Sequence, residues 1–385
     1  MIFNKFRLED ITDKIGDGIH GTPEYDENGD FYFVNGNNLV EGDIVFKSDT
    51  KRINEEQYLK NKRDLNKKTL LVSINGTLGN VAKYNNEKII LGKSACYINI
   101  KDEYNVDYVY FVFKSPEFKK YLQYGANGTT IKNVPLSAIR NYEISIPSKE
   151  NQDKIVKILK SIEDKIKLND KINNNLRELI NQNYSNYLCE LDDYTELDIK
   201  DIFDFETGVE PGSKNYLEKR EENSIKFYRV GDMNSECNTF IKEDLSNAKL
   251  IDENDVVVSF DGTIGRIGYG LKGAYSTGMK KISINSKYKN IIDNSLVYAY
   301  FNSKDIQNIM MENARGTTIL HASSSVDFMN FKYNENLLKK YGKLISVAFD
   351  KMKSIKNENE KLSKLKDTLL PKLMNGEIDL DNIQI

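Results

Sequence analysis

The sequence predicts an α+β fold with two globular domains, each a mixed, bent β-sheet with helices, and two long helices joining them. The two helices are expected to pair antiparallel as a coiled coil, which gives the chain pseudo-two-fold symmetry. Three features predict this fold: motifs that recur at a nearly constant offset, short apolar runs between Gly and Asn turns, and two long segments with 3-and-4 apolar spacing. The expected boundaries are 1–148 and 193–333 for the globular domains, and 149–192 and 334–385 for the helical segments.

Two loop motifs carry the repeat. Residues 73–79 (SINGTLG) and 259–265 (SFDGTIG) both follow the pattern S-x-x-G-T-x-G, 186 residues apart. Residues 126–131 (ANGTTI) recur 188 residues later as 314–319 (ARGTTI). Two further matches remain collinear with these, 164–167 with 350–353 and, less closely, 33–39 with 227–233. The alternative is two unrelated domains that share common Gly-Thr turns, and the collinear order favours a duplicated unit.

Short alternating runs predict strands and hairpins in each copy, interrupted by one helical piece. In the first copy the runs are at 70–74, 88–92, 95–100 and 142–147, and the helical piece is at 108–123. In the second copy the runs are at 255–260 and 280–284, and the helical piece is at 295–310. The same order of elements in both copies supports one repeated unit.

The segment from about residue 152 to 189 and the last segment of the chain have the spacing of long amphipathic helices. A helix of about 36 residues spans roughly 54 Å. Pairing the helices would bury both apolar stripes, whereas the alternative is that each helix packs on its own domain. The residues expected in the helix pairing are Ile155, Leu159, Ile162, Ile166, Asn173, Leu176, Ile345, Met352, Ile355, Asn359 and Leu362. Of these, Asn173 and Asn359 are expected to fix the register.

Composition and motifs argue against several other classes of protein. No apolar run approaches the roughly 20 residues of a membrane span, no signal peptide is recognised, and the three cysteines lie far apart, as expected for a cytoplasmic protein. The two histidines form no zinc-ligand pattern. Leu91–Ser94 lacks the Gly that a phosphate-binding loop needs, because that position is Glu87, and no adenine-methyltransferase motif occurs. We therefore expect no catalysis, no metal site and no cofactor bound by this chain.

Two similar domains held a fixed distance apart suit recognition of a split DNA site, although the net charge of −3 indicates no generally basic surface. Basic residues from Lys51 to Lys68 could follow phosphates, and polar residues near the Gly-Thr turns could reach base edges. The candidate DNA-binding residues of the first domain are Asn37, Asn38, Lys51, Arg52, Asn75, Gly76, Thr77, Lys93, Ser94, Thr129, Thr130 and Lys132. Those of the second domain are Arg229, Asp232, Asp261, Gly262, Thr263, Arg266, Lys280, Lys281, Arg315, Thr317 and Thr318.

The order of these motifs resembles one family. F-x-x-G-N-N-L at 33–39, S-x-x-G-T-x-G at 73–79 and G-T-T-I at 128–131 are similar to a target-recognition domain of type I restriction–modification specificity subunits. The segment 144–155 resembles that family's entry into its conserved helix, and the run LKDTLLPKLMNGEI at 365–378 is the most specific match. The resemblance extends over essentially the whole chain.

The resemblance implies a subunit that catalyses nothing and selects a bipartite site in double-stranded DNA. It also implies two methyltransferase subunits, which methylate adenine N6 with S-adenosylmethionine, and, in a restriction complex, two motor–nuclease subunits that use ATP and Mg²⁺. Two departures affect the helix starts: Asn151 is an extra residue in the entry motif, and residues 326–333 lack that motif. The competing hypothesis is a coiled-coil adaptor without DNA recognition, which the helices alone do not exclude.

Overall fold

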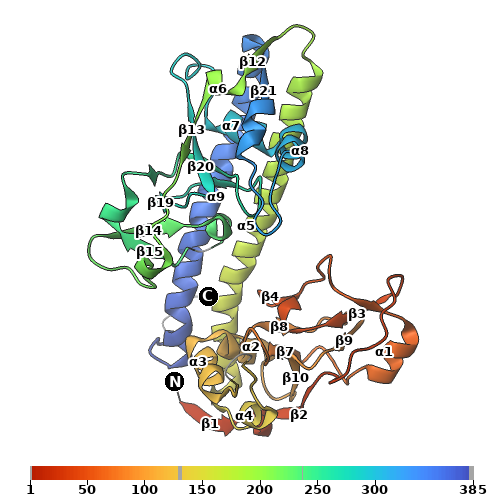
Figure 1. Ribbon diagram of the computed structural model, residues 1–385. Coiled ribbons are helices and arrows are strands. Elements are labelled where there is room, and N and C mark those ends of the chain that lie inside the picture. The colour runs from red at the N-terminus through yellow and green to blue at the C-terminus, as the bar shows by residue number, and fades with distance from the viewer. Residues whose placement is uncertain (1, 129–131, 236, 381–385) are drawn as a thin grey trace. The chain divides into compact units, whose positions relative to one another are not determined.

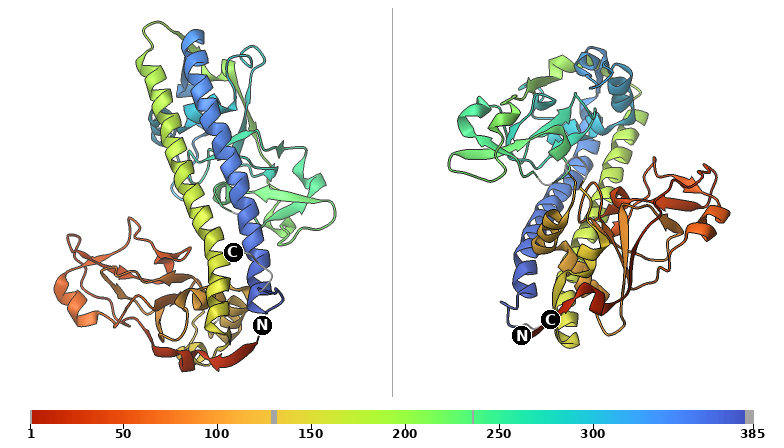
Figure 2. Two further views of the ribbon diagram at one scale, coloured as in Figure 1. Left: turned by 180° about the vertical axis from the view of Figure 1, so that it is seen from behind. Right: turned by 60° about the horizontal axis from the view of Figure 1, so that its bottom comes forward.

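The computed structural model describes residues 2–128, 132–235 and 237–380. The chain divides into two compact units: unit 1 is residues 1–165 with 362–385, and unit 2 is residues 166–361. The division falls inside two long helices, α5 (Lys149–Cys189) and α9 (Glu335–Met374). Each unit therefore contains one globular domain and a part of both helices, which can be followed by colour in Figure 1 and Figure 2.

The described residues of the globular domain of unit 1 form short strands and four α-helices. Its elements are β1 (Phe3–Arg7), β2 (Thr12–Asp17), β3 (Phe31–Val34), β4 (Leu39–Val40), β5 (Asp43–Ile44), β6 (Arg52–Ile53), α1 (Glu55–Asn61), β7 (Thr69–Ser73), β8 (Val81–Lys83), β9 (Ile89–Leu91), β10 (Ala95–Ile100), α2 (Val106–Lys114), α3 (Pro116–Gly125), α4 (Leu136–Arg140) and β11 (Glu143–Pro147). The strands form sheets of order β2-β10-β7-β8, β6-β3-β9, β1-β11 and β4-β5. The largest is antiparallel, whereas β3 and β9 run parallel.

Unit 2 contains a domain of the same kind. Its elements are β12 (Thr195–Asp198), α6 (Ile199–Ile202), β13 (Phe203–Thr207), β14 (Ser224–Tyr228), β15 (Phe240–Lys242), β16 (Leu250–Ile251), β17 (Val256–Ser259), β18 (Ile267–Tyr269), β19 (Gly273–Tyr275), β20 (Met279–Ile284), α7 (Asn294–Asn302), α8 (Lys304–Glu312) and β21 (Asn330–Tyr333). The sheets have the orders β13-β20-β17-β18, β15-β14-β19-β16 and β12-β21.

The two domains share one topology. The sheet β2-β10-β7-β8 corresponds to β13-β20-β17-β18, the ribbon β1-β11 corresponds to β12-β21, and the parallel pair β3-β9 corresponds to β14-β19. The predicted α+β class and the predicted duplication are therefore confirmed.

The structure differs from the prediction at each helical piece: where one helix was predicted, it has two, α2 and α3 in unit 1 and α7 and α8 in unit 2. In unit 1 the break lies at Ser115, since Pro116 has no N–H and its ring clashes with a preceding helical turn. The Ser115 hydroxyl oxygen accepts a hydrogen bond from the amide of Phe118 at 3.2 Å, which caps the second helix. In unit 2 the break falls at Ser303.

The two long helices pair antiparallel within each unit. In unit 2, Glu190 accepts a hydrogen bond from Tyr341, and Asn169 donates to Asn359. The later residue of α5 thus contacts the earlier residue of α9, which shows that the helices run in opposite directions. In unit 1 the first turns of α5 and the last turns of α9 share one apolar cluster, which includes Ile155, Leu159, Leu370 and Leu373. Within the described ranges, no helix combines the length and apolar composition that a membrane span requires.

Most of the residues expected in the helix pairing are buried. Ile155, Leu159, Ile162, Ile345, Met352 and Ile355 have under a tenth of their surface exposed, and Ile166, Asn173, Leu176, Asn359 and Leu362 are half-buried. The polar contact differs from the one expected, because Asn359 bonds to Asn169 and Asp170. The Oδ1 atom of Asn173 is buried and has no partner among the described residues.

Candidate nucleic-acid interface

The S-x-x-G-T-x-G motif of each unit forms the same turn at the end of a buried strand, β7 or β17. In both turns, the amide of the last Gly donates to the carbonyl of the Ser at 2.9 Å. The first Gly has a φ of +75° in unit 1 (Gly76) and +73° in unit 2 (Gly262), a region that favours glycine. The motif is therefore explained by backbone geometry, and the Thr that follows this Gly is exposed in both units.

A second repeated loop closes onto this turn. In unit 1, Asn133 forms backbone bridges both with Asn75 of the turn and with Asn127, just before the G-T-T-I segment. In unit 2, His321 forms the same two bridges, with Asp261 and Arg315. The reciprocal backbone hydrogen bonds of Asn133 with Asn127, and of His321 with Arg315, are 2.8 to 2.9 Å long. The two motifs that revealed the repeat thus lie side by side in each domain.

A third segment packs on the S-x-x-G-T-x-G turn. It is a short 3-10 helix that follows β3 in unit 1 and β14 in unit 2. In unit 1 this 3-10 helix is Gly36–Asn38: the Gly36 amide donates to the Ser94 hydroxyl at 3.0 Å, and the Asn80 side chain donates to the Gly36 carbonyl at 3.5 Å. In unit 2 it is Val230–Asp232, and the Arg266 side chain donates to the Val230 carbonyl at 3.3 Å. Three segments far apart in the sequence therefore form one surface in each domain.

The candidate residues differ in how much of them reaches this surface. Those that are exposed are Asn37, Lys51, Arg52, Gly76, Thr77, Lys93, Lys132, Arg229, Gly262, Thr263, Arg315, Thr317 and Thr318. Those that are half-buried are Asn75, Ser94, Asp232, Asp261, Arg266, Lys280 and Lys281, and Asn38 is buried. Thr129 and Thr130 lie outside the described residues.

Asn38 and Asp232 hold their turns in shape. The Asn38 Oδ1 accepts a hydrogen bond from the Asn35 amide at 2.9 Å, while its Nδ2 donates to the Val45 carbonyl and the Thr50 hydroxyl, each at 3.0 Å. Asp232 accepts equivalently from the Arg229 amide, and it also binds the Arg229 guanidinium at 3.0 Å. The side chains of Asn38 and Asp232 are thus already engaged within the protein.

Two lysines on β20 also have partners within the domain. Lys281 pairs with Glu206 at 3.2 Å and donates to the Leu250 carbonyl at 3.0 Å. The Lys280 ammonium lies 5.0 Å from the centre of the Phe260 ring. Burial lowers the pKa of Lys280, against the opposing effect of the Asp261 carboxylate. These two cations are less available to a phosphate than their sequence positions suggest.

Lys51 and Arg52 lie on an aromatic surface of unit 1. The Arg52 guanidinium is 5.2 Å from the centre of the Tyr32 ring and donates to the Tyr32 hydroxyl at 3.1 Å. The Lys51 ammonium is 5.8 Å from the centre of the Tyr25 ring. Both residues are exposed, as contacts to a DNA backbone require.

Asn133 and His321 were not among the predicted site residues. Each follows the last residue of its G-T-T-I segment by two positions, but the residue types differ, so no motif match marks them. Their common role is a backbone bridge, which is independent of side-chain type. In the described part of the chain, no group of three or more His, Cys, Asp or Glu side chains is placed to hold a metal ion.

Comparison with known proteins decides what the two domains are. The family described as type I restriction modification DNA specificity domain matches residues 3–178 and again residues 192–332. The chain belongs to the type I restriction–modification DNA specificity family. The two matched segments are two specificity domains, one for each globular domain of the structure.

Individual relatives agree with this membership. The specificity subunit of a type I restriction enzyme from Methanocaldococcus jannaschii is 25% identical, covering 98% of this chain and 94% of the relative. A type I specificity subunit from Mycoplasma genitalium is 25% identical over 80% of this chain and 81% of the relative. In fold, the crystal structure of a type I restriction–modification S subunit from M. genitalium matches 97% of this chain and 96% of its own with a TM-score of 0.57, at 20% identity.

The function that follows is that of a specificity subunit, and these relatives are named for specificity rather than for catalysis. The expectation of a non-catalytic subunit is therefore confirmed, and the adaptor hypothesis gains no support from the matches.

The first specificity domain is joined to α5 by the motif that precedes this helix. Gln152 is buried: its Oε1 accepts a hydrogen bond from the Asn105 amide at 2.9 Å, and its Nε2 donates to the Pro147 carbonyl at 3.0 Å. Since Asn105 caps α2, one side chain links the end of β11, the start of α2 and the first turn of α5. The entry motif thus sets where the helix leaves the first specificity domain.

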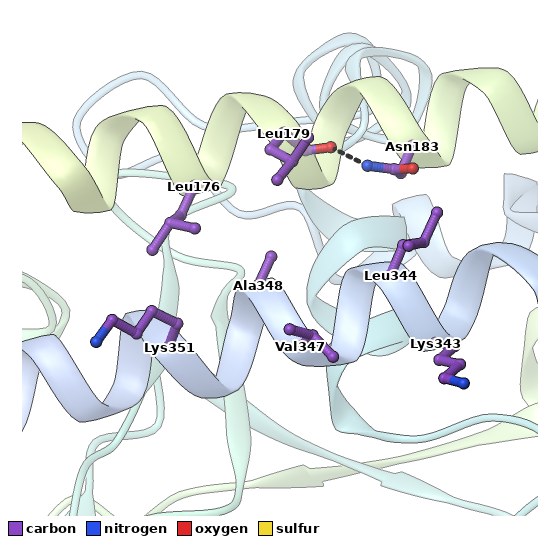
Figure 3. Close-up of a pocket in the computed structure, with 8 residues that line it drawn as sticks. All are labelled: Leu176, Leu179, Asn183, Lys343, Leu344, Val347, Ala348 and Lys351. Carbon is purple, nitrogen blue, oxygen red and sulfur yellow. Dashed lines mark hydrogen bonds between the residues drawn. The ribbon is translucent and has the colours of Figure 1, made fainter.

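The helix pair of unit 2 carries an exposed apolar groove. Figure 3 shows Leu176, Leu179 and Asn183 on α5, opposite residues of α9. The residues from α9 are Lys343, Leu344, Val347, Ala348 and Lys351. Val347 is 67% exposed, Leu344 is 53% exposed and Leu179 is 47% exposed, which is unusual for apolar side chains that have a neighbouring helix to pack on.

Proposed function

We propose that each specificity domain reads one half of a two-part DNA sequence, and that the paired helices set the unread spacing and bind methyltransferase subunits. The observation that carries the proposal is the convergence of the same three segments on one surface in both domains. The first domain would read one half-site, and its duplicate, the second domain, would read the other. The chain would act in the cytoplasm, where it has access to DNA.

Differences between the two surfaces support two different half-sites. Unit 1 presents Asn75 and Asn127 beside its bridge residue, whereas unit 2 presents Asp261 and Arg315 at the equivalent positions. Asn, Asp and Arg offer different patterns of hydrogen-bond donors and acceptors to base edges in the major groove. The common backbone would therefore hold different reading groups.

The test of half-site independence is a domain exchange. Residues 1–148 are replaced by the corresponding domain of the M. genitalium relative, and the complex selects from a random double-stranded DNA library. A change in one half of the selected sequence is expected, with the other half preserved. A change in both halves contradicts the proposal, as does affinity that does not fall with salt, because phosphate contacts release counterions.

The helices are proposed to set the spacing because α5 continues without a break from one unit into the other. Inserting one heptad into α5 and the matching heptad into α9 adds about 10 Å of helix, or about three base pairs. The selected sequence is expected to gain about three unread positions. An unchanged spacing would exclude this role of the helices.

Two docking faces are proposed for methyltransferase subunits. One is the groove of unit 2, whose rim lysines Lys343 and Lys351 suit an amphipathic helix with acidic flanks. The other is the face around Leu365 in unit 1. Leu365 is the repeat equivalent of Leu179, at an offset of 186 residues, and it is 46% exposed, whereas Leu179 is 47% exposed. Two equivalent faces would bind two methyltransferases. S-adenosylmethionine, and ATP and Mg²⁺ in a complex that also contains two motor–nuclease subunits, would then be bound by the partners.

A further inference from the structure

The imidazole of His321 stands where the two repeated loops of unit 2 meet. Its Nδ1 lies 2.8 Å from Oδ1 of Asp261, and 60% of its side chain is exposed, against 28% for Asp261. Its backbone is fixed by two hydrogen bonds with Arg315, of 2.8 and 2.9 Å. The ring is therefore held on one side and open on the other.

We propose that His321 reads a base in the half-site of the second domain, and that Asp261 is its positioning residue; the inference rests on the proposed function. An ionised carboxylate can only accept, so the Nδ1 that faces Asp261 carries a proton. In the neutral ring this leaves Nε2 as a lone-pair acceptor. In the major groove such an acceptor matches an exocyclic amino group, N6 of adenine or N4 of cytosine.

The side chain of His321 is not needed to hold the loops together. Backbone hydrogen bonds do this: the Gly262 amide donates to the Leu320 carbonyl at 2.9 Å, and the Ala322 amide donates to the Phe260 carbonyl at 2.7 Å. Unit 1 makes the equivalent bonds with Asn133 in place of the histidine. Loop closure therefore tolerates different side chains at this position, which leaves the side chain free for recognition.

The equivalent residue in unit 1 points to the same use. Asn133 is exposed and occupies the same backbone position, and an Asn amide can bond to adenine in a bidentate manner. The two positions thus carry different reading groups on one scaffold. His321 and Asn133 are therefore assigned as equivalent base-reading residues that select different bases in the two half-sites.

The experiment uses the full chain in complex with its methyltransferase. This complex selects its binding sites from a double-stranded DNA library that is randomised across both half-sites. His321→Gln is expected to change the base preference at one position of one half-site by about tenfold or more. His321→Asn, which introduces the residue of the first domain, is expected to shift that position towards adenine. Asp261→Asn is expected to weaken the same preference, because an amide no longer enforces the protonated Nδ1.

The matched control is His20→Gln. His20 is the other histidine of the chain, is 75% exposed, and lies 2.9 Å from Asp17, but it belongs to unit 1. It is expected to leave the second half-site unchanged, and the thermal unfolding midpoints of all variants should match that of the parent. If both His321 variants select the parent sequence, the inference is wrong while the proposed function stands. If the parent complex selects no sequence, the proposed function itself fails.

Discussion

The Nδ2 atom of Asn169 on α5 donates a hydrogen bond to Oδ1 of Asn359 on α9 at 2.8 Å, and Asn169 is 1% exposed. Asn359 in turn donates to Asp170 at 2.8 Å. Asn169 also donates to Glu358 at 2.9 Å, and Asn359 is half-buried. A polar contact of this kind stabilises less than an apolar pair would, but it penalises any other register of the helices, because a shift would leave the buried Asn169 amide unpaired. Register within unit 2 is therefore specified by Asn169 rather than by Asn173.

Removing one partner should cost more than removing both. Asn169→Ala is expected to lower the free energy of unfolding by about 1–3 kcal/mol, since it leaves the Asn359 carbonyl oxygen without its donor. The double variant Asn169→Leu with Asn359→Leu is expected to be nearly neutral. Urea unfolding measures both, with the exposed Lys171→Ala as control. A double variant less stable than Asn169→Ala would contradict this account.

Lys356 makes stability depend on pH above neutrality. Its Nζ donates to the Tyr269 carbonyl at 2.6 Å, and burial lowers its pKa to about 8, with Glu360 opposing and Lys226 adding to the shift. An unfolded lysine titrates near 10.4, so between about pH 8 and pH 10.4 the unfolded chain binds more protons than the folded chain. The free energy of unfolding therefore rises with pH across this window.

The measurement compares the parent with Lys356→Met by urea unfolding. The free energy of unfolding of the parent minus that of the variant is expected to increase by roughly 2–3 kcal/mol from about pH 7.5 to pH 10.5. Other titrating groups contribute equally to both proteins and cancel. Parallel curves for the two proteins would show that Lys356 does not titrate in this range.

Two glycines of the candidate interface should respond unequally to alanine. A Cβ on Gly316, whose φ is +122°, would lie 2.1 Å from the Ile319 carbonyl oxygen, whereas at Gly262 it would meet no atom within 4 Å. Gly262→Ala should cost about 1–2 kcal/mol from its positive φ alone. Gly316→Ala must also displace the loop, so it should speed hydrogen exchange at the bridged amides of Arg315 and His321. Equal exchange in the two variants would count against the loop geometry.

The apolar groove of unit 2 should separate partner binding from DNA recognition. Val347→Asp places a charge among Leu179 and Leu344, and we expect it to weaken methyltransferase capture at that face at least about tenfold, with DNA-site preference and folding unaffected. Phe328→Asp, 60% exposed and outside the groove, serves as the control. Loss of DNA preference in Val347→Asp, or capture equal to that of the control, would refute the docking role of the groove.

The fold was predictable because its determinants leave residue-type patterns. Gly76 and Gly262 mark positive-φ turns that few other residues tolerate, and the apolar spacing of α5 and α9 records which faces are buried. Both signals survive in a single sequence. The break at Ser115 was also visible in principle, since Pro116 follows it.

The surface was less predictable because its contacts do not depend on side-chain type. Asn133 and His321 occupy one backbone position with different chemistry, so no repeated letter identifies them. From the sequence, Lys281 was expected to be free to bind DNA. In the structure, the pairing of β13 with β20 brings Glu206 to within 3.2 Å of it. Such pairings join residues about 75 positions apart and leave no local pattern.

The core of unit 1 contains Leu370, Leu373 and Leu380, whereas unit 2 ends at residue 361. During synthesis, all of unit 2 has therefore been made before the final segment of unit 1 leaves the ribosome. The domain encoded first is the last that can be completed, and its apolar face remains open while the 196 residues of unit 2 are added. Until that final segment has been made, the apolar face of the early domain is open to chaperones and proteases.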